Sequence, residues 1–309
     1  MTLAAPEQNL RRLDAQHFDW VVSVELQVKL QPTFATLTYL DLSQSCSSFA
    51  FAILGDIRVL RLDSDPANDL GHYESRVDGH ISSANAFLAD LEYLQMGFQP
   101  IPFWDFPEGQ VSFDIFEHID PTKLVALDVN FDSSLVKPFI GHLPTFTTLQ
   151  SLVLSISHDL RSSTPNPSGP LLVATMAGAA KLNLRHLTLS VWPSPDTLRS
   201  LPSTLTSLVV DFGHPRGRVY DNEAKLLPPL HDPDVPTMIT LVRDARHWKS
   251  HYLPALQVLG VSAYALVEED AGDMDAKARV LAAMAGVEGF EFFLLAPGEP
   301  ERFFPGQWV

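Results

Sequence analysis

The chain has 309 residues, of which 46% are hydrophobic and 19% charged, so it can bury a large apolar core. Its formal charge of −16 at pH 7 argues against nucleic acid and anionic membranes as partners, because both bind clustered Lys and Arg. The single cysteine, Cys46, cannot form an intramolecular disulfide, which is typical of a reducing compartment.

The N-terminus and the hydropathy of the chain predict a soluble protein of the cytoplasm or nucleus. Residues 1–7 lack the basic and apolar regions of a signal peptide. No stretch approaches the roughly 18 continuous apolar residues of a membrane span.

An apolar phrase, Leu-x-x-Leu-x-Leu, recurs through most of the chain. The phrase ends in period-2 alternation, which is typical of a β-strand with one buried face. Successive copies begin 20 to 51 residues apart, which leaves room for a turn or a helix between strands. The nine copies begin at Leu37, Ile57, Leu91, Leu124, Leu149, Leu184, Leu205, Leu256 and Val287.

The ends of the repeated region differ from its middle. Residues 10–14 predict part of one helix, and residues 21–26 predict an atypical strand that shields the first repeat. We therefore expect an N-terminal cap over 1–36, an array over 37–295 with a long loop at 211–234, and a C-terminal cap over 296–309.

Helices are predicted between several phrases. Expected segments are 82–91, a helix opening at Ser133 or Ser134 with Pro138 in its first turn, 171–180, 235–252, and 274–285 with Gly286 as its stop. Alternating strands and helices predict parallel strands.

These phrases resemble those of leucine-rich repeat proteins over residues 21–295, and the irregular spacing is similar to the repeat region of fungal F-box proteins. No F-box is visible ahead of the repeats. The resemblance implies an α/β solenoid with a parallel concave sheet, helices and loops on the convex side, and a non-enzymatic role. Three residues after the phrase, where regular repeats carry Asn or Cys, this chain has unlike residues, among them Trp192.

The residues flanking the central Leu of each phrase should point out of the sheet and offer a face to another protein. Tyr and Arg concentrate binding energy, which favours the first four repeats. An ordinary solvated charge cluster explains the same residues equally well. If the face binds a protein, Arg61→Glu should weaken partner binding while leaving thermal stability nearly unchanged. The candidate protein-binding residues are Tyr39, Asp41, Arg61, Asp63, Tyr93 and Asp128.

The long loop carries a second candidate surface with Arg216, Arg218 and Tyr220. Long loops inside compact domains are often functional, although a tolerated insertion is the alternative. The loop region also gathers Asp211, His214, Asp221, His231 and Asp232, so a hydrolase-like or metal-binding enzyme is the rival hypothesis.

No phosphate-binding glycine loop, nucleophile elbow or zinc-type cysteine spacing is found, and no cofactor is expected. His186 is interpreted as a surface side chain on the sheet, and Cys46 as an inert thiol. The sequence thus favours a monomeric scaffold that binds another protein, related to F-box substrate-recognition modules. A structural protein that has lost its partners is a further alternative.

Overall fold

The computed structural model describes residues 11–14, 36–42, 57–62, 89–97, 116, 119–132, 136–157, 175–212, 234–262 and 273–295. Two compact units divide the chain, residues 1–128 and 129–309, and the division falls inside strand β5 (Ala126–Asp132). Each unit is described by itself.

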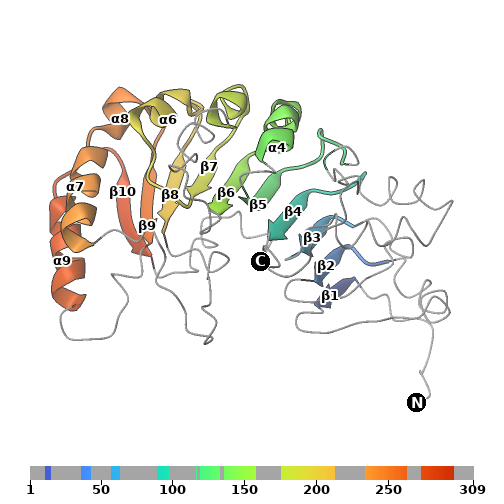
Figure 1. Cartoon of the computed structure of the whole chain (residues 1–309), viewed down its shortest axis with the longest axis horizontal. Coiled ribbons are helices and arrows are strands. Elements are labelled where there is room, and N and C mark those ends of the chain that lie inside the picture. Colours follow the sequence, from blue (N-terminus) through green and yellow to red (C-terminus); the bar gives the residue numbers. More distant parts are fainter. Residues whose placement is uncertain are drawn as a thin grey trace, which may run out of the picture. The chain divides into compact units, whose positions relative to one another are not determined.

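Four parallel strands in chain order form the sheet of the first unit (Figure 1): β1 (Arg12–Asp14), β2 (Tyr39–Leu42), β3 (Val59–Leu62) and β4 (Tyr93–Gly97). The start of β5 joins β4, since the Ala126 amide donates to the Glu92 carbonyl at 3.1 Å. One strand earlier the Tyr93 amide donates to the Arg58 carbonyl in the same way, and there Tyr93 pairs in register with Val59. By the same geometry Ala126 lies beside Tyr93 and Asp128 beside Gln95.

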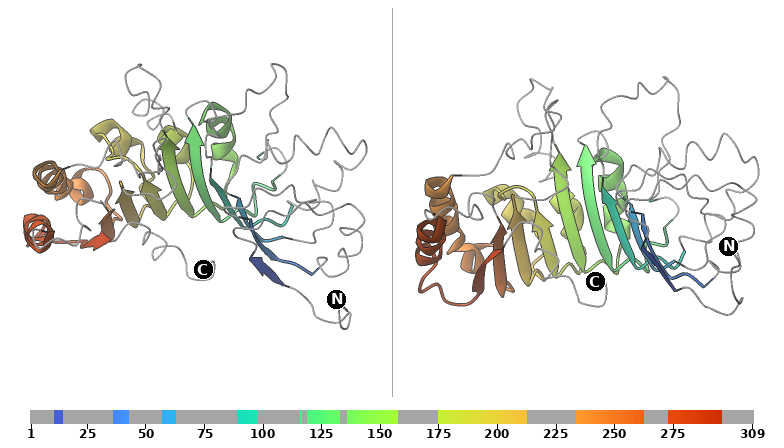
Figure 2. Two further views of the ribbon diagram at one scale, coloured as in Figure 1. Left: turned by 60° about the horizontal axis from the view of Figure 1, so that its bottom comes forward. Right: turned by 90° about the horizontal axis from the view of Figure 1, so that it is seen from below.

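The second unit repeats this order with β6 (Ser151–Ser157), β7 (His186–Leu189), β8 (Ser207–Asp211), β9 (Val258–Ser262) and β10 (Glu291–Leu295). The pairs β6–β7, β7–β8, β8–β9 and β9–β10 are all parallel, and Figure 2 shows these strands side by side. Within each unit the strand order is that of the chain. The fold is therefore the predicted α/β leucine-rich repeat fold.

The leucine phrases form the core because each strand places equivalent residues in one row. Leu40, Leu60 and Leu94 pair in register, as do Leu152, Leu187, Leu208 and Leu259 in the second unit. Each of these seven side chains is at most 1% exposed. Burial of one leucine side chain stabilises a fold by about 1.5–3 kcal/mol, so the rows supply the main cohesion between neighbouring repeats.

The predicted ninth phrase, which begins at Val287, starts two residues too early. In the sheet Phe292 pairs with Leu259 and Leu294 with Val261, so the phrase in register is Gly289/Phe292/Leu294. Gly289 has a φ of +100°, a conformation that favours glycine and starts the strand after a tight turn. The aromatic run 290–293 fits the phrase in more than one way, and only strand pairing selects the register.

The prediction of helix for residues 10–14 is wrong, because Arg12–Asp14 is a strand that pairs with β2. Leu10, Leu13 and Ala15 carry the repeat phrase with a small third residue, and this is the signal that could have identified it. The predicted capping strand at 21–26 lies outside the described residues. Of the predicted helix at 82–91, residues 82–88 also lie outside them, and residues 89–91 are not helical.

The helices of the second unit lie on one side of its strands (Figure 1): α4 (Val136–His142), α6 (Pro195–Ser200), α7 (Val235–Ala245), α8 (Trp248–His251) and α9 (Asp273–Ala283). A 3-10 turn, η3 (Leu143–Thr145), follows α4, and residues 175–179 are also helical. Pro138 lies in the first turn of α4, as predicted. Helix α6 was missed, although Ser194 caps it by accepting the Thr197 amide at 3.1 Å.

The predicted helix at 235–252 is two helices, because the backbone tightens at Arg246 and His247. Their amides donate to carbonyls three residues earlier, at Arg243 and Asp244, instead of four. The apolar face predicted for this segment consists of Met238, Leu241, Val242, Ala245 and Trp248, and all of these are buried except Leu241, which is partly exposed. Helix α9 ends as predicted: Gly286 adopts a left-handed φ of +76° after it.

Three aromatic rings join the repeats of the second unit to their helices. Trp192 stacks on Phe212 with ring centroids 6.4 Å apart and contacts Trp248 of α8 at 4.9 Å. Trp192 stands where regular repeats carry the Asn or Cys that bonds adjacent turns. Ring packing here replaces that hydrogen bonding, which explains why an irregular residue is tolerated at this site.

Gly260→Val is expected to lower the free energy of unfolding by about 1–3 kcal/mol through overpacking. A Cβ at Gly260 would lie 2.9 Å from Cδ1 of Leu295 and 3.2 Å from Cγ2 of Val209. Urea unfolding measures the change. Gly141→Ala in α4 is the control, since nothing lies within 4 Å of a Cβ there and stability should not fall. Equal effects of the two changes would contradict the close packing of β9 against Leu295.

Candidate functional site: a tyrosine–arginine cluster on the first unit

The columns of residues flanking the central leucines are confirmed, but the expectation of a solvated face is wrong for most of them. Asp41, Gln95, Val153 and Val209 are each at most 4% exposed. Tyr39, Arg61 and His186 are partly exposed, so the accessible column residues are individual side chains and not a continuous solvated face.

Four side chains of the first unit stack across strands β1 to β4, and we call them the tyrosine–arginine cluster: Arg12, Tyr39, Arg61 and Tyr93. The Arg12 guanidinium carbon lies 4.1 Å from the centre of the Tyr39 ring. The Arg61 guanidinium carbon lies 5.8 Å from Tyr39 and 5.6 Å from Tyr93, between the two rings. Cations and aromatic faces thus alternate along the cluster, an arrangement that attracts through the ring quadrupoles.

Asp41 balances the charge of Arg61 from beneath the cluster. Its Oδ2 lies 3.7 Å from Nη1 of Arg61 and accepts a hydrogen bond of 3.4 Å from the Tyr39 hydroxyl. The Asp41 side chain is 1% exposed and that of Arg61 is 16% exposed, so the ion pair is shielded from solvent. Asp41 and Arg61 therefore orient Tyr39 and contribute little accessible charge of their own.

The far end of the cluster is polar and closed. The Tyr93 hydroxyl donates to Oε1 of Gln95 at 3.2 Å, and both residues are 4% exposed. Asp128, beside Gln95 in the next strand, is 7% exposed. Accessible surface is concentrated at the opposite end, where Arg12 is exposed and Tyr39 is partly exposed.

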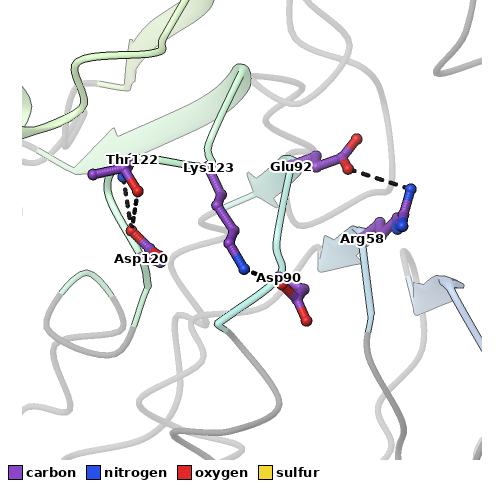
Figure 3. A network of polar contacts seen from close by, with 6 residues as sticks. All are labelled: Arg58, Asp90, Glu92, Asp120, Thr122 and Lys123. Carbon is purple, nitrogen blue, oxygen red and sulfur yellow. Dashed lines mark hydrogen bonds and ion pairs between the residues drawn. The ribbon is translucent and has the colours of Figure 1, made fainter.

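The edge of the sheet where the strands begin carries a separate, solvated network of charges (Figure 3). Arg58 pairs with Glu92 at 3.5 Å, and Lys123 pairs with Asp90. Asp120 accepts hydrogen bonds from the hydroxyl and the amide of Thr122, which hold the pKa of that carboxyl below its ordinary value. Ion pairs with this much exposure contribute about 0–1 kcal/mol each, so this network adds little to the stability of the fold.

Of the residues predicted to bind a protein, the structure brings together Tyr39, Asp41, Arg61 and Tyr93, and it buries Asp128. Asp63, Arg216, Arg218 and Tyr220 lie outside the described residues. Sequence reasoning missed Arg12 and Gln95. Arg12 was missed because its strand was interpreted as helix, and Gln95 because an uncharged side chain gave no signal in its column.

His186, predicted as a surface side chain, is half-buried on β7. Its ring nitrogen Nδ1 is buried and has no hydrogen-bond partner among the described residues, and the same holds for the hydroxyl of its register neighbour Ser207. Burial lowers the pKa of His186 below its ordinary value, and the adjacent Arg185 cation lowers it further. The folded protein consequently holds His186 neutral.

Acidification is therefore expected to destabilise the second unit through His186. The unfolded chain binds a proton at this residue near pH 6.5, while the folded chain resists it, so stability falls as the pH drops below about 6.5. In thermal melts at pH 7.5 and 5.5, His186→Leu should show a smaller drop in Tm than the unmodified protein. The exposed Leu281 of α9, changed to Ala, removes no titratable group and should leave the drop unaltered. An undiminished drop in His186→Leu would contradict the buried, neutral state.

The rival enzymatic hypothesis finds no support among the described residues. Within them, no group of three or more His, Cys, Asp or Glu side chains could hold a metal ion. Asp211 is fully buried at the end of β8, whereas His214, Asp221, His231 and Asp232 lie outside the described part of the chain. Among the helices described here, none is both long and apolar enough to cross a bilayer.

Comparison with known proteins adds little to this picture. No protein-family model matches the chain, and no curated protein matches it. One similar solved structure is the leucine-rich repeat-containing protein LegL7 from Legionella pneumophila, at 16% identity and a TM-score of 0.46, covering 92% of this chain and 82% of that one. A likeness of this size is too weak to build on, and the fold is assigned here from strand order and register.

Proposed function

We propose that this protein is a non-enzymatic interaction scaffold whose first unit binds another protein through the tyrosine–arginine cluster. The single observation that carries the proposal is the stack of Arg12 on Tyr39, supported from behind by the ion pair of Arg61 with Asp41. Tyr and Arg are the residues most enriched at the energetic centres of protein interfaces. A rigid, preorganised pair also loses little conformational entropy on binding.

Different members of the cluster take different roles in this proposal. Arg12 and Tyr39 are accessible and contact the partner directly. Arg61, Asp41 and Tyr93 are enclosed and set the position of the Tyr39 ring. Substitutions at Arg12 should thus weaken binding without loss of fold, whereas substitutions at Arg61 act through stability.

Finer features of the protein are part of the same proposal. The phrase spacing supports a substrate-recognition role like that of F-box-associated repeats, and the single cysteine supports a cytoplasmic or nuclear location. We further propose a monomer with caps at 1–36 and 296–309 around an array at 37–295. Asp63, Arg216, Arg218 and Tyr220 are retained as predicted contact residues.

Site-specific photocrosslinking tests the proposed surface. A benzophenone amino acid replaces Thr38, which is partly exposed beside Arg12 and Tyr39, or Ala282, which is exposed on α9 of the second unit. Illumination in source cells, followed by mass spectrometry, should give a protein adduct from position 38 that position 282 does not give. Adducts only from position 282, or the same adducts from both, would place binding elsewhere.

A further inference from the structure

Two neighbouring arginines at the start of β1 are positively charged, and no acidic side chain in the described part of the chain neutralises them. Arg11 and Arg12 are both exposed, and neither forms an ion pair with a described residue. Arg12 is also held in place, because its guanidinium lies 4.1 Å from the centre of the Tyr39 ring. A guanidinium that stacks by its face keeps the N–H groups of its edge available for another acceptor.

The backbone brings a third arginine to the same edge. The amides of Thr38 and Tyr39 donate to the Arg11 carbonyl, and the Arg58 amide donates to the Thr38 carbonyl. Arg11, Thr38 and Arg58 therefore form one row across β1, β2 and β3, with Arg12 beside it. The Arg58 side chain is 61% exposed and has Glu92 as its partner at 3.5 Å.

The carboxylate nearest to the tyrosine–arginine cluster is already engaged. Asp41 is 1% exposed and is occupied by Arg61 and by the Tyr39 hydroxyl. The end of the cluster that a partner can reach is consequently cationic, although the whole chain carries a charge of −16. Arg12 at this end lies beside Arg11 and Arg58 at the adjoining edge where the strands begin, and we call these three residues the arginine row.

We propose that the arginine row binds an acidic segment of a partner protein, with Arg12 receiving a carboxylate in a bidentate pair. This inference rests on the proposed function and names the chemistry of its partner. Planar guanidinium groups match the two oxygens of an Asp or Glu side chain, and charge-assisted pairs of this kind are stronger than neutral hydrogen bonds.

A protein segment fits the arginine row better than a nucleic acid does. The same edge of the sheet continues into Glu92, Asp90 and Asp120, which would repel an extended phosphate backbone. A short acidic segment needs only the length of three strands, about 10 Å from β1 to β3. The net negative charge of the chain is largely screened at that range, because the Debye length is about 8 Å at physiological ionic strength.

Fluorescence anisotropy with defined peptides tests the inference on the full chain. The probe is a fluorescein-labelled hexaglutamate peptide, compared with hexalysine, a Gly-Ser hexapeptide and a ten-residue oligothymidine. We expect hexaglutamate to bind more tightly than the other three probes, and its affinity to fall as NaCl is raised from 50 to 300 mM.

Matched variants locate the binding. Arg12→Gln should weaken hexaglutamate binding about tenfold, whereas Arg12→Lys should weaken it less because it keeps the charge but loses the planar fork. Arg199→Gln is the control: Arg199 is also exposed, pairs with Asp196 and faces the Tyr252 ring, but lies in the second unit. The affinity of the Arg199→Gln variant for hexaglutamate should equal that of the unmodified protein. Thermal melts should show that all three variants remain folded.

Four outcomes would overturn the inference: no binding of hexaglutamate, equal binding by Arg12→Gln, tighter binding of oligothymidine, or stronger binding at high salt. The proposed function is judged separately by the crosslinks from position 38. A crosslinked partner with no hexaglutamate binding would reject the acidic segment and keep the scaffold. If hexaglutamate binding depends on Arg12 but position 38 gives no protein adduct, the preference for an acidic ligand would stand and the proposed role as a protein-binding scaffold would be rejected.

Discussion

The Arg61→Glu variant should lose about 3–5 kcal/mol of unfolding free energy, because the change breaks a shielded ion pair and adds a like charge. Asp41 is 1% exposed and loses its cation, while the new carboxylate faces it across the cluster. The Tyr39 and Tyr93 rings also lose the guanidinium that lies between them. Urea unfolding followed by circular dichroism measures the loss. This result would correct the expectation, drawn from sequence, of nearly unchanged stability.

Two controls separate burial from charge in this experiment. Arg58→Glu reverses the same kind of charge directly before the strand that carries Arg61, but its side chain is 61% exposed, so it should cost less than about 1 kcal/mol. Adding Asp41→Asn to Arg61→Glu should recover part of the loss, since one of the two facing carboxylates becomes neutral. Similar costs for Arg61→Glu and Arg58→Glu would show that the cluster is not shielded.

Trp248→Ala should cost about 3–5 kcal/mol, the other large loss that the structure predicts. The Trp248 side chain is 3% exposed and packs against Trp192, which in turn stacks on Phe212. Removal of the indole leaves a cavity between α8 and the ends of β7 and β8. Truncation should also change the intrinsic fluorescence of the folded protein, because Trp192 loses a neighbouring ring.

Leu281→Ala is the comparison for Trp248→Ala. Leu281 is 47% exposed on α9, so its truncation should change stability by less than about 1 kcal/mol. The urea concentrations at which the two variants unfold should therefore differ clearly. If Trp248→Ala unfolded at nearly the same urea concentration as Leu281→Ala, the aromatic contact would not be a stabilising part of the second unit.

These stability effects decide which variants can test the proposed binding surface. A loss of partner binding in variants at Arg61 or Asp41 could come from loss of the local fold, so those variants do not distinguish direct contact from structural support. Arg12 can, because it is exposed and its loss removes only a stacked cation. Arg12 is thus the informative residue for binding experiments, and it lies in β1, the strand that was predicted to be helical.

Sequence alone determined the strands of the first eight phrases and the membership of their columns. The phrase has period-2 alternation, and this local property places Leu40, Leu60 and Leu94 on the same face of their strands, where they pair in register and are buried. It likewise groups Tyr39 with Tyr93 and Asp41 with Arg61, because equivalent positions of successive repeats must fall in line.

Only the tertiary structure decided which of those outward residues a partner can reach. Exposure depends on neighbours contributed by other repeats: Arg12 comes to Tyr39 across 27 residues of chain, and Arg61 is enclosed by rings from the strands on both sides. The register of β10 and the break between α7 and α8 were decided in the same way. Alternation along one strand specifies a direction for each side chain, but distances between strands depend on how separate segments pack, and a local pattern does not contain them.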